Sequence, residues 1–383
     1  MPIPQRATDI VAPDALISAA QTLEAAQEIA VDIEADQMHH FRARLCFVQL
    51  GSDEDIFLVD TLAPGVTPTP LGPLLGNPAR TKFFHAAGGD LAYLASAGIR
   101  VQGLFDTHRA ATLLGWPKIG LADLVLEHLK VQLKKDHQQS DFSLRPLPPG
   151  MRDYIADDVR YLVDLGRLVQ KACVDADIVE EVSLDCLRMT EEAKPLAETG
   201  GEFRPKIAKQ GLSAAQVRLA EFLAHRLNAA RLTWAEAEDL PFGRMLSNAA
   251  IGAIAVKPPQ SLGELKKLEG VRGGFLRTHG EACLGLIQDA MADFAREDTQ
   301  SAVPAPKPDP RIRKREDRLG DFRKAKALER KVTPSVVLTT AQVAELSKNP
   351  PASLEALAAL PYFGQKRTRL YGEALLTLLR GVE

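Results

Sequence analysis

The feature that most constrains the fold is a repeat in the C-terminal part of the chain. Residues 258–286 align without gaps with residues 350–378, at an offset of 92 positions, and 12 of the 29 aligned residues are identical. Chance predicts about two identities in an alignment of this length, so the similarity indicates a duplication. Beyond about residue 210 the apolar residues follow helical spacing, without strand-like alternation. The repeat therefore predicts a duplicated, all-helical domain.

The domain boundaries follow from this repeat and from changes in composition. Prolines at 304, 306, 308 and 310 predict a stiff linker between the two copies. The N-terminal part instead shows strands followed by alternating strands and helices, which is typical of an α/β domain. We predict an α/β domain over 1–175, a helical linker over 176–208, a first helical domain over 209–297, a proline-rich linker over 298–311 and a second helical domain over 312–383.

Carboxylates stand at regular positions on the predicted elements of the α/β domain. Three strands are predicted between residues 29 and 61, because apolar runs there are separated by turn residues. In the first of these strands, Val31 and Ile33 alternate with Asp32 and Glu34. Because successive side chains of a strand point to opposite faces, this strand would bury one face and present two carboxylates on the other.

Two further carboxylates and a tyrosine complete a possible metal site. Asp90 follows a fourth predicted strand, TKFFHA, and Tyr154 and Asp158 are four residues apart on one predicted helix face. Together with Asp32 and Glu34, these carboxylates would repel one another strongly unless cations lay between them. Two divalent metal ions about 4 Å apart would supply that charge, activate water and stabilise the leaving oxygen of a phosphodiester. Oxygen ligands favour Mg²⁺ or Mn²⁺.

The charge of the chain is distributed unevenly. Residues 1–195 contain 18 Lys and Arg against 28 Asp and Glu, whereas the remainder contains 29 against 22. We interpret this as a carboxylate-rich active site beside a surface that binds a polyanion, with random variation of surface charge as the alternative. No apolar run reaches the roughly 18 residues of a membrane helix, and the start lacks a signal-peptide pattern, so a cytoplasmic location without membrane attachment is predicted. The absence of GxxxxGK[ST] excludes an ATP-driven helicase of the P-loop type.

Several segments, taken in order, resemble one known family. VDIEAD, KFFHAAGGDLAYL and YIADDVRYL resemble the three motifs of the proofreading-type 3′–5′ exonuclease superfamily, in its tyrosine-containing branch. RLCFVQLG, FDTHRAATLLG and KKDHQQSDFSLRPL are similar to segments of ribonuclease D, whose bacterial members carry paired helicase-and-RNase-D C-terminal domains. The resemblance spans about residues 20–380. It implies a ribonuclease H-like mixed sheet flanked by helices, followed by two helical bundles.

The resemblance also implies roles for individual residues. The family's metal-binding acids fall on Asp32, Glu34, Asp90 and Asp158. Asp32 would bridge two metal ions, and Tyr154 would orient the attacking water through its hydroxyl. Asp157 competes with Asp158 for the last position, but only Asp158 has the four-residue spacing to Tyr154.

A second group of residues is expected near the nucleic acid. These candidates are His85, Lys135, Gln138 and Arg145, of which Arg145 is expected beside a phosphate. For His85, a hydrogen-bonded structural role is the alternative. Phe142 stands where the family usually has Trp, which removes an indole donor but keeps an aromatic ring.

The function implied by the resemblance is that of a metal-dependent 3′–5′ exoribonuclease. It would trim RNA 3′ ends, those of tRNA precursors included, release nucleoside 5′-monophosphates and act as a monomer. A 3′–5′ exodeoxyribonuclease with the same site is an alternative, because contacts with the 2′-hydroxyl are not visible in a sequence. Another is a non-catalytic nucleic-acid-binding protein, although such a protein would be expected to lose acids that this chain retains.

Overall fold

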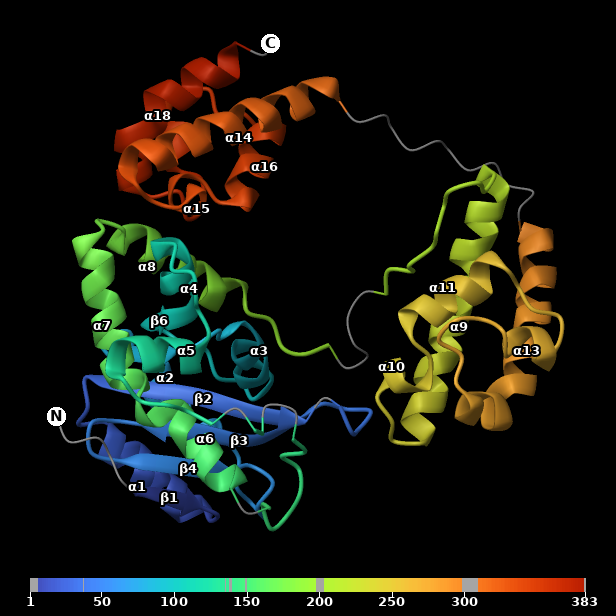
Figure 1. The fold of residues 1–383 in the computed structure, drawn as a ribbon, viewed down its shortest axis with the longest axis horizontal. Coiled ribbons are helices and arrows are strands. Elements are labelled where there is room, and N and C mark those ends of the chain that lie inside the picture. The colour runs from blue at the N-terminus through green and yellow to red at the C-terminus, as the bar shows by residue number, and fades with distance from the viewer. Residues whose placement is uncertain are drawn as a thin grey trace. The chain divides into compact units, whose positions relative to one another are not determined.

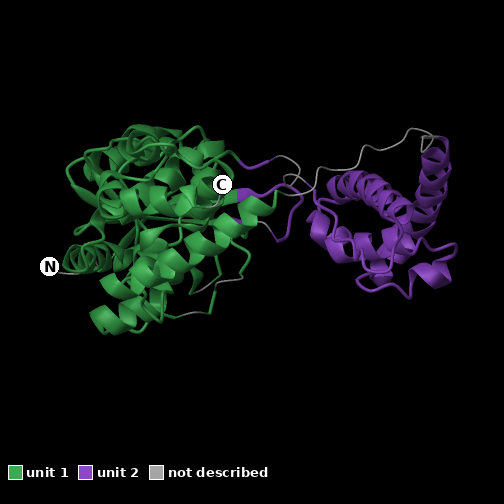
Figure 2. Cartoon of the chain, turned by 90° about the horizontal axis from the view of Figure 1, so that it is seen from above, with its two compact units in different colours: residues 1–34, 45–195, 306–383 green, residues 35–44, 196–305 purple. Residues whose placement is uncertain are grey.

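The structure is a computed structural model that describes residues 6–36, 38–134, 136–137, 140–148, 150–197, 203–297 and 309–381. The chain forms two compact units (Figure 2). Unit 1 comprises Met1–Glu34, Leu45–Pro195 and Pro306–Glu383, and unit 2 comprises Ala35–Arg44 and Leu196–Ala305. Among the described residues, no helix is long and apolar enough to cross a membrane.

A mixed sheet forms the centre of the N-terminal domain. Its strands in the described part of the chain are β1 (Ala7–Ile10), β2 (Glu28–Asp36), β3 (Arg44–Gly51), β4 (Ile56–Asp60), β5 (Thr81–Phe84) and β6 (Leu104–Asp106), in the spatial order β1-β4-β3-β2-β5-β6. β3 and β4 are antiparallel, whereas β1 is parallel to β4 and β5 is parallel to β2 and β6. The four predicted strands are confirmed. β1 and β6 were not predicted, because four and three residues are too few to form a recognisable pattern.

Helices cover the sheet on both faces (Figure 1). α1 (Pro13–Leu23) packs on β1, α6 (Met151–Arg160) packs on β4, and α4 (Thr107–Leu114) and α7 (Leu162–Asp175) pack on β5. The remaining helical elements of this domain are η1 (Thr69–Leu71), α2 (Gly72–Leu75), α3 (Gly88–Ser96), α5 (Leu121–Leu124), η2 (Val125–Leu129) and α8 (Val179–Glu192).

Two helical bundles follow, as the repeat predicts. The first contains α9 (Ala214–Ala237), α10 (Phe242–Met245), α11 (Asn248–Val256), α12 (Leu262–Leu265) and α13 (Gly273–Glu297). The second contains α14 (Pro310–Arg330), α15 (Pro334–Val337), α16 (Thr340–Lys348), α17 (Leu354–Ala358) and α18 (Gln365–Arg380). The predicted fold class, a mixed sheet with flanking helices followed by two helical bundles, is confirmed. The predicted domain boundaries remain a prediction.

The two bundles share structural detail at the offset of 92 residues. Asp239 and Lys331 both adopt positive φ angles, 47° and 56°, at the turn after the first long helix. Arg231 and Arg323 each donate a hydrogen bond to the carbonyl of the leucine 15 residues further on, at 2.9 and 3.2 Å. The equivalence of the two copies therefore extends beyond the 29 residues in which the sequence repeat is visible.

The second bundle shares a core with the N-terminal domain. Val336 of α15 belongs to the same buried cluster as Ala110 and Leu113 of α4. The Thr333 hydroxyl also donates to the Leu113 carbonyl at 3.0 Å. These contacts make the second bundle a part of unit 1.

Candidate active site

Strand β2 places two carboxylates on one face. Val31 and Ile33 are buried, with exposed fractions of 0 % and 8 %, whereas Asp32 and Glu34 between and after them are only half-buried. The alternation seen in the sequence is therefore present in the structure, because one face of the strand packs into the core.

Asp32, Glu34 and Asp158 converge on one point. A carboxylate oxygen from each of the three lies within 4.8 Å of the others. Tyr154, one turn before Asp158 on α6, joins them at the wall of a cavity of about 290 Å³. The residues that line this cavity are Asp32, Glu34, His85, Gly120, Leu121, Ala122, Leu133, Lys134, Tyr154 and Asp158.

Proximity and burial make these carboxylates hard to ionise together. Burial raises the pKa of Asp32 to about 7. Burial, followed by repulsion from Asp32, Asp158 and Asp90, raises the pKa of Glu34 to about 10. The pKa values of Asp90 and Asp158 are also raised, mainly by burial and then by the charge of Asp32. Bound cations would remove this electrostatic cost, and the donor set, composed of carboxylate oxygens, suits a hard divalent ion.

Asp90 lies in the first turn of α3. Its charge helps to raise the pKa of Glu34, but it is not among the three acids whose oxygens lie within 4.8 Å, so its role as a metal ligand remains a prediction. Asp106 holds the backbone that leads into α3. The Asp106 carboxylate accepts hydrogen bonds from the backbone N–H groups of Ala86 and Ala87, at 3.2 and 2.8 Å. Ala86 has a positive φ of 64°, which costs free energy in a residue other than glycine unless the surroundings hold it. The sequence predicts only that Asp106 caps α4, which it does by accepting from the Arg109 N–H at 2.9 Å.

His85 lines the cavity as a neutral side chain. Its Nδ1 lies 2.9 Å from the Thr107 hydroxyl, which itself donates to the Phe84 carbonyl at 3.0 Å. We therefore assign the imidazole proton to Nδ1, which leaves Nε2 as an acceptor. Burial and the neighbouring His108 lower the pKa of His85 to about 4, so the ring remains neutral at physiological pH.

Two rings pack against Tyr154. The His137 ring meets it edge-on at 5.8 Å between centroids, and the buried Phe142 ring lies nearly parallel to it at 6.3 Å. Burial, then the charges of Asp158 and Glu34, raises the pKa of Tyr154, so that its hydroxyl remains protonated. No pattern in the sequence predicts a role for His137 or Lys134, because their positions beside Tyr154 and at the cavity depend on tertiary packing.

Of the two neighbouring aspartates on α6, Asp158 belongs to the cluster of carboxylates formed with Asp32 and Glu34. Asp157 forms an ion pair with Arg160, at 2.7 Å, one turn further along the same helix. The two neighbouring aspartates therefore have different surroundings, and the metal-binding role of Asp158 remains a prediction.

The predicted nucleic-acid-binding residues have different surroundings. Lys135 and Gln138 lie outside the described residues, and their roles remain predictions. Arg145 is held by protein acceptors: both oxygens of Asp60, each at 2.6 Å, and the carbonyls of Phe142 and Cys46, at 2.8 and 3.2 Å. It therefore anchors its loop to the sheet, and a contact between Arg145 and RNA remains a prediction.

We expect Arg145→Gln to lower the free energy of unfolding by about 2 kcal/mol, because it leaves the mostly buried Asp60 carboxylate without its partner. Urea denaturation followed by circular dichroism would measure the change. Lys171→Gln, which breaks an exposed helical pair with Asp175, is the control and should change stability by less than about 0.5 kcal/mol. Equal effects of the two substitutions would contradict an anchoring role for Arg145.

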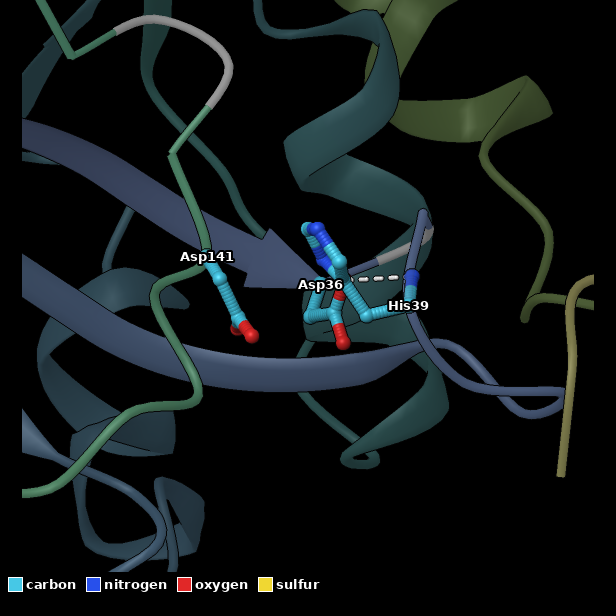
Figure 3. Close-up of side chains that lie close together, drawn as sticks. All are labelled: Asp36, His39 and Asp141. Atoms are coloured by element: carbon cyan, nitrogen blue, oxygen red, sulfur yellow. Dashed lines mark hydrogen bonds and ion pairs between the residues drawn. The ribbon is translucent and has the colours of Figure 1, made fainter.

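β2 ends in a turn that its last residue closes. The Asp36 carboxylate accepts hydrogen bonds from the backbone N–H groups of Met38 and His39, at 3.0 and 3.1 Å, and lies 2.8 Å from His39 Nδ1 (Figure 3). The next residue, His40, pairs with Asp239 of the first helical bundle at 2.7 Å. These contacts lie within unit 2, to which the turn belongs.

The raised pKa values predict how metal-free protein responds to pH. Because the folded state holds the Asp32 proton more tightly than the unfolded chain does, this group stabilises the fold at low pH, and the contribution is lost as pH rises towards 7. In EDTA, we expect the free energy of unfolding to fall by about 1.4 kcal/mol per pH unit for each such group between pH 5 and 7. Urea titrations of wild type and of Asp32→Asn/Glu34→Gln would isolate the effect, and identical pH profiles for the two proteins would contradict it.

Comparison with known proteins identifies the family. A family model described as 3′–5′ exonuclease matches residues 8–172, and one described as HRDC domain matches residues 221–287 and 313–379. The two HRDC matches are also separated by 92 residues, in agreement with the internal repeat.

Two bacterial relatives match this chain over most of their own length. Ribonuclease D of Gluconacetobacter diazotrophicus is 28 % identical over 363 residues, which cover 92 % of this chain and 88 % of the relative. Ribonuclease D of Escherichia coli is 30 % identical over 284 residues, which cover 73 % and 74 % of the two chains. The crystal structure of the E. coli enzyme superposes with a TM-score of 0.69 at 26 % identity, over 98 % of this chain and 99 % of that one. The chain therefore belongs to the ribonuclease D family of 3′–5′ exoribonucleases.

Proposed function

We propose that this enzyme removes nucleotides one at a time from RNA 3′ ends, tRNA precursors included, and releases nucleoside 5′-monophosphates. The observation that carries the proposal is the convergence of Asp32, Glu34 and Asp158 within 4.8 Å, beside the protonated Tyr154 hydroxyl and in an accessible cavity. We also propose that the enzyme acts as a monomer in the cytoplasm, as the sequence predicts.

Asp32, Glu34, Asp90 and Asp158 would hold the divalent metal ions that exonucleases of this class use. We propose two ions, Mg²⁺ or Mn²⁺, because four carboxylates that repel one another need more than one divalent charge to ionise together. Ions held by these residues would supply Lewis-acid activation of water and stabilisation of the leaving oxygen.

Neighbouring side chains would position the reactants. Tyr154 keeps its proton, so its hydroxyl can donate one hydrogen bond while accepting another, which orients a water molecule for attack. His85 offers a neutral Nε2 acceptor for a ribose hydroxyl at the wall of the same cavity. Lys134, exposed at the cavity mouth, can contact the phosphate that is attacked or the next one along the strand.

The body of the RNA would be held by positive charge on α14. Residues 310–383 contain 15 Lys and Arg against 8 Asp and Glu, whereas residues 209–297 contain 11 against 10, so the excess charge belongs to the second bundle. Arg311, Arg313, Lys314 and Lys324 of α14 are exposed. Exposed cations of this kind bind phosphates without sequence preference, through counterion release.

We expect Arg313→Gln/Lys314→Gln to weaken the binding of a tRNA-sized RNA by about fivefold at moderate salt and to reduce the slope of log K against log salt by about 1 to 2. Fluorescence anisotropy in EDTA at three salt concentrations measures both quantities without cleavage. Lys348→Gln, an exposed cation of the same bundle on α16, is the control. An unchanged salt slope in the double variant would refute the assignment of RNA binding to α14.

The reaction itself can be tested with labelled oligonucleotides. RNA labelled at its 5′ end should give a ladder that shortens from the 3′ end, and RNA labelled at its 3′ end should release a labelled nucleoside 5′-monophosphate at once. A 3′-phosphate should block the ladder. DNA of the same sequence should be cut more slowly, and equal or faster cleavage of DNA would favour the exodeoxyribonuclease alternative.

A further inference from the structure

The turn that begins α18 in the second bundle faces the acidic N-terminal part of α8. The Lys366 backbone N–H donates to Glu180 at 2.9 Å, and its Nζ lies 2.9 Å from Asp177 and 3.4 Å from Glu181. Arg330, at the end of α14, pairs with the other oxygen of Glu181 at 3.4 Å. Three carboxylates thus receive a helix N-terminus and two cations from the second bundle.

The centre of this contact is buried, although Asp177 at its edge is exposed. Glu181 is 1 % exposed and Lys366 is 8 % exposed. Gly364, with φ of +89°, allows the close approach, because a Cβ atom there would lie 2.5 Å from a Glu180 carboxylate oxygen. Because an unpaired charge in such a buried position is costly, each of these charged groups remains paired with its partner. The helix N-terminus and the two cations are thus already satisfied by protein carboxylates, which use the same interactions as an anion bound at a helix N-terminus.

The equivalent corner of the first bundle has the opposite charge. At the offset of 92 residues, Arg330 corresponds to Glu238 and Lys366 to Gly274. Arg330 donates to the Tyr371 hydroxyl at 2.7 Å, and in the first bundle Glu238 pairs at 2.6 Å with His279, the residue equivalent to Tyr371. The geometry of the corner is kept while its charge is reversed.

The acidic corner of the first bundle also holds a segment of chain. Asp239 pairs with His40 at 2.7 Å and accepts a hydrogen bond from the Phe41 N–H at 3.1 Å, and Glu236 pairs with Arg42 at 3.0 Å. The segment held is therefore basic, whereas the segment held by the second bundle is acidic.

We propose that this corner, formed by Glu236 and Asp239 in the first bundle and by Arg330 and Lys366 in the second, is a docking surface for protein segments, and that its charge selects the segment. The second bundle takes the acidic start of α8, and the first takes the basic turn after β2. In consequence, Arg330 and Lys366 are not available to bind RNA. The RNA affinity of the second bundle comes instead from the exposed cations of α14.

Hydrogen exchange in the full-length protein tests the docking. Arg330→Gln and Glu181→Gln should each raise amide exchange in peptides covering residues 177–192 and 362–371 by about tenfold or more, and the double variant should raise it by less than the product of the two. Lys324→Gln, which removes an exposed cation of the same helix, should leave exchange unchanged. Tyr362→Phe, which removes only a peripheral hydrogen bond to Glu191 at 2.7 Å, is a milder variant should the others fail to fold.

Two further readouts complete the test. Asp239→Asn should speed exchange at the Phe41 amide and leave the α8 peptide unchanged. Binding of a tRNA-sized RNA in EDTA should change by less than twofold in Arg330→Gln. The proposal is overturned if the effects of Arg330→Gln and Glu181→Gln simply multiply, or if Arg330→Gln weakens RNA binding fivefold without a change in exchange. Since no cleavage is measured, these results are independent of the proposed hydrolytic function.

Discussion

Asp32→Ala and Asp158→Ala are each expected to lower the turnover number for RNA trimming by at least about a thousandfold, because each removes a carboxylate from the centre at which transition-state charge is compensated. Both side chains contribute an oxygen to the group that lies within 4.8 Å. Initial rates of nucleotide release from a short single-stranded RNA measure the effect, with full kinetics at saturating RNA to separate turnover from binding.

Asp157→Ala is the matched control, since it removes the neighbouring carboxylate of the same helix. Its ion pair with Arg160 lies outside the cavity, so we expect turnover to remain within about threefold of wild type. In metal-free buffer, Asp32→Ala should be at least as stable as wild type, because a repelling charge is lost. Retained activity in Asp158→Ala together with lost activity in Asp157→Ala would reverse the assignment of the two positions.

Removal of divalent metal should abolish trimming. After dialysis against EDTA, we expect the rate to fall by at least about a thousandfold, and Mg²⁺ or Mn²⁺ should restore it, because four acids with raised pKa values need cations to ionise together. The same label-release assay, run at a series of metal concentrations, measures both steps.

A binding measurement separates metal at this site from metal on the RNA. Mg²⁺ should raise the melting temperature of wild-type protein and should not raise that of Asp32→Asn/Glu34→Gln. Full activity after metal stripping would exclude the metal-dependent mechanism. An equal thermal shift in the two proteins would show that the ion binds elsewhere.

Much of the site is visible in the sequence because it depends on local periodicity. The alternation of Val31 and Ile33 with Asp32 and Glu34 indicates that the two acids share one face of a strand. The spacing of Tyr154 and Asp158 indicates that they share one face of a helix. Local spacing does not show, however, that this strand and this helix meet in the fold. The order of the motifs supplied this information through their resemblance to a family.

Other parts of the site depend on pairs that are distant in the sequence. Arg145 meets Asp60 across 85 positions, and this ion pair gives an anchoring role to a residue that the sequence places beside RNA. Lys134 and His137 enter the site with the loop that this pair helps to hold. Because no pattern in the sequence specifies which of several exposed acids will pair with a given arginine, such roles can be assigned only from the structure.

The sequence by itself determined the fold class and the duplicated helical bundle, and it placed Asp32 with Glu34 on one strand face and Tyr154 with Asp158 on one helix face, since each of these features is encoded by spacing within one element or by a repeat. Only the tertiary structure decided which charges remain free. In the sequence, the cations of the second bundle cannot be told apart. In the structure, Lys366 is buried and Arg330 is half-buried, both beside Glu181, whereas Arg313 and Lys314 remain exposed. The physical reason is that the fate of a charge depends on burial and on its partner, and both are set by packing between segments some 150 or more residues apart.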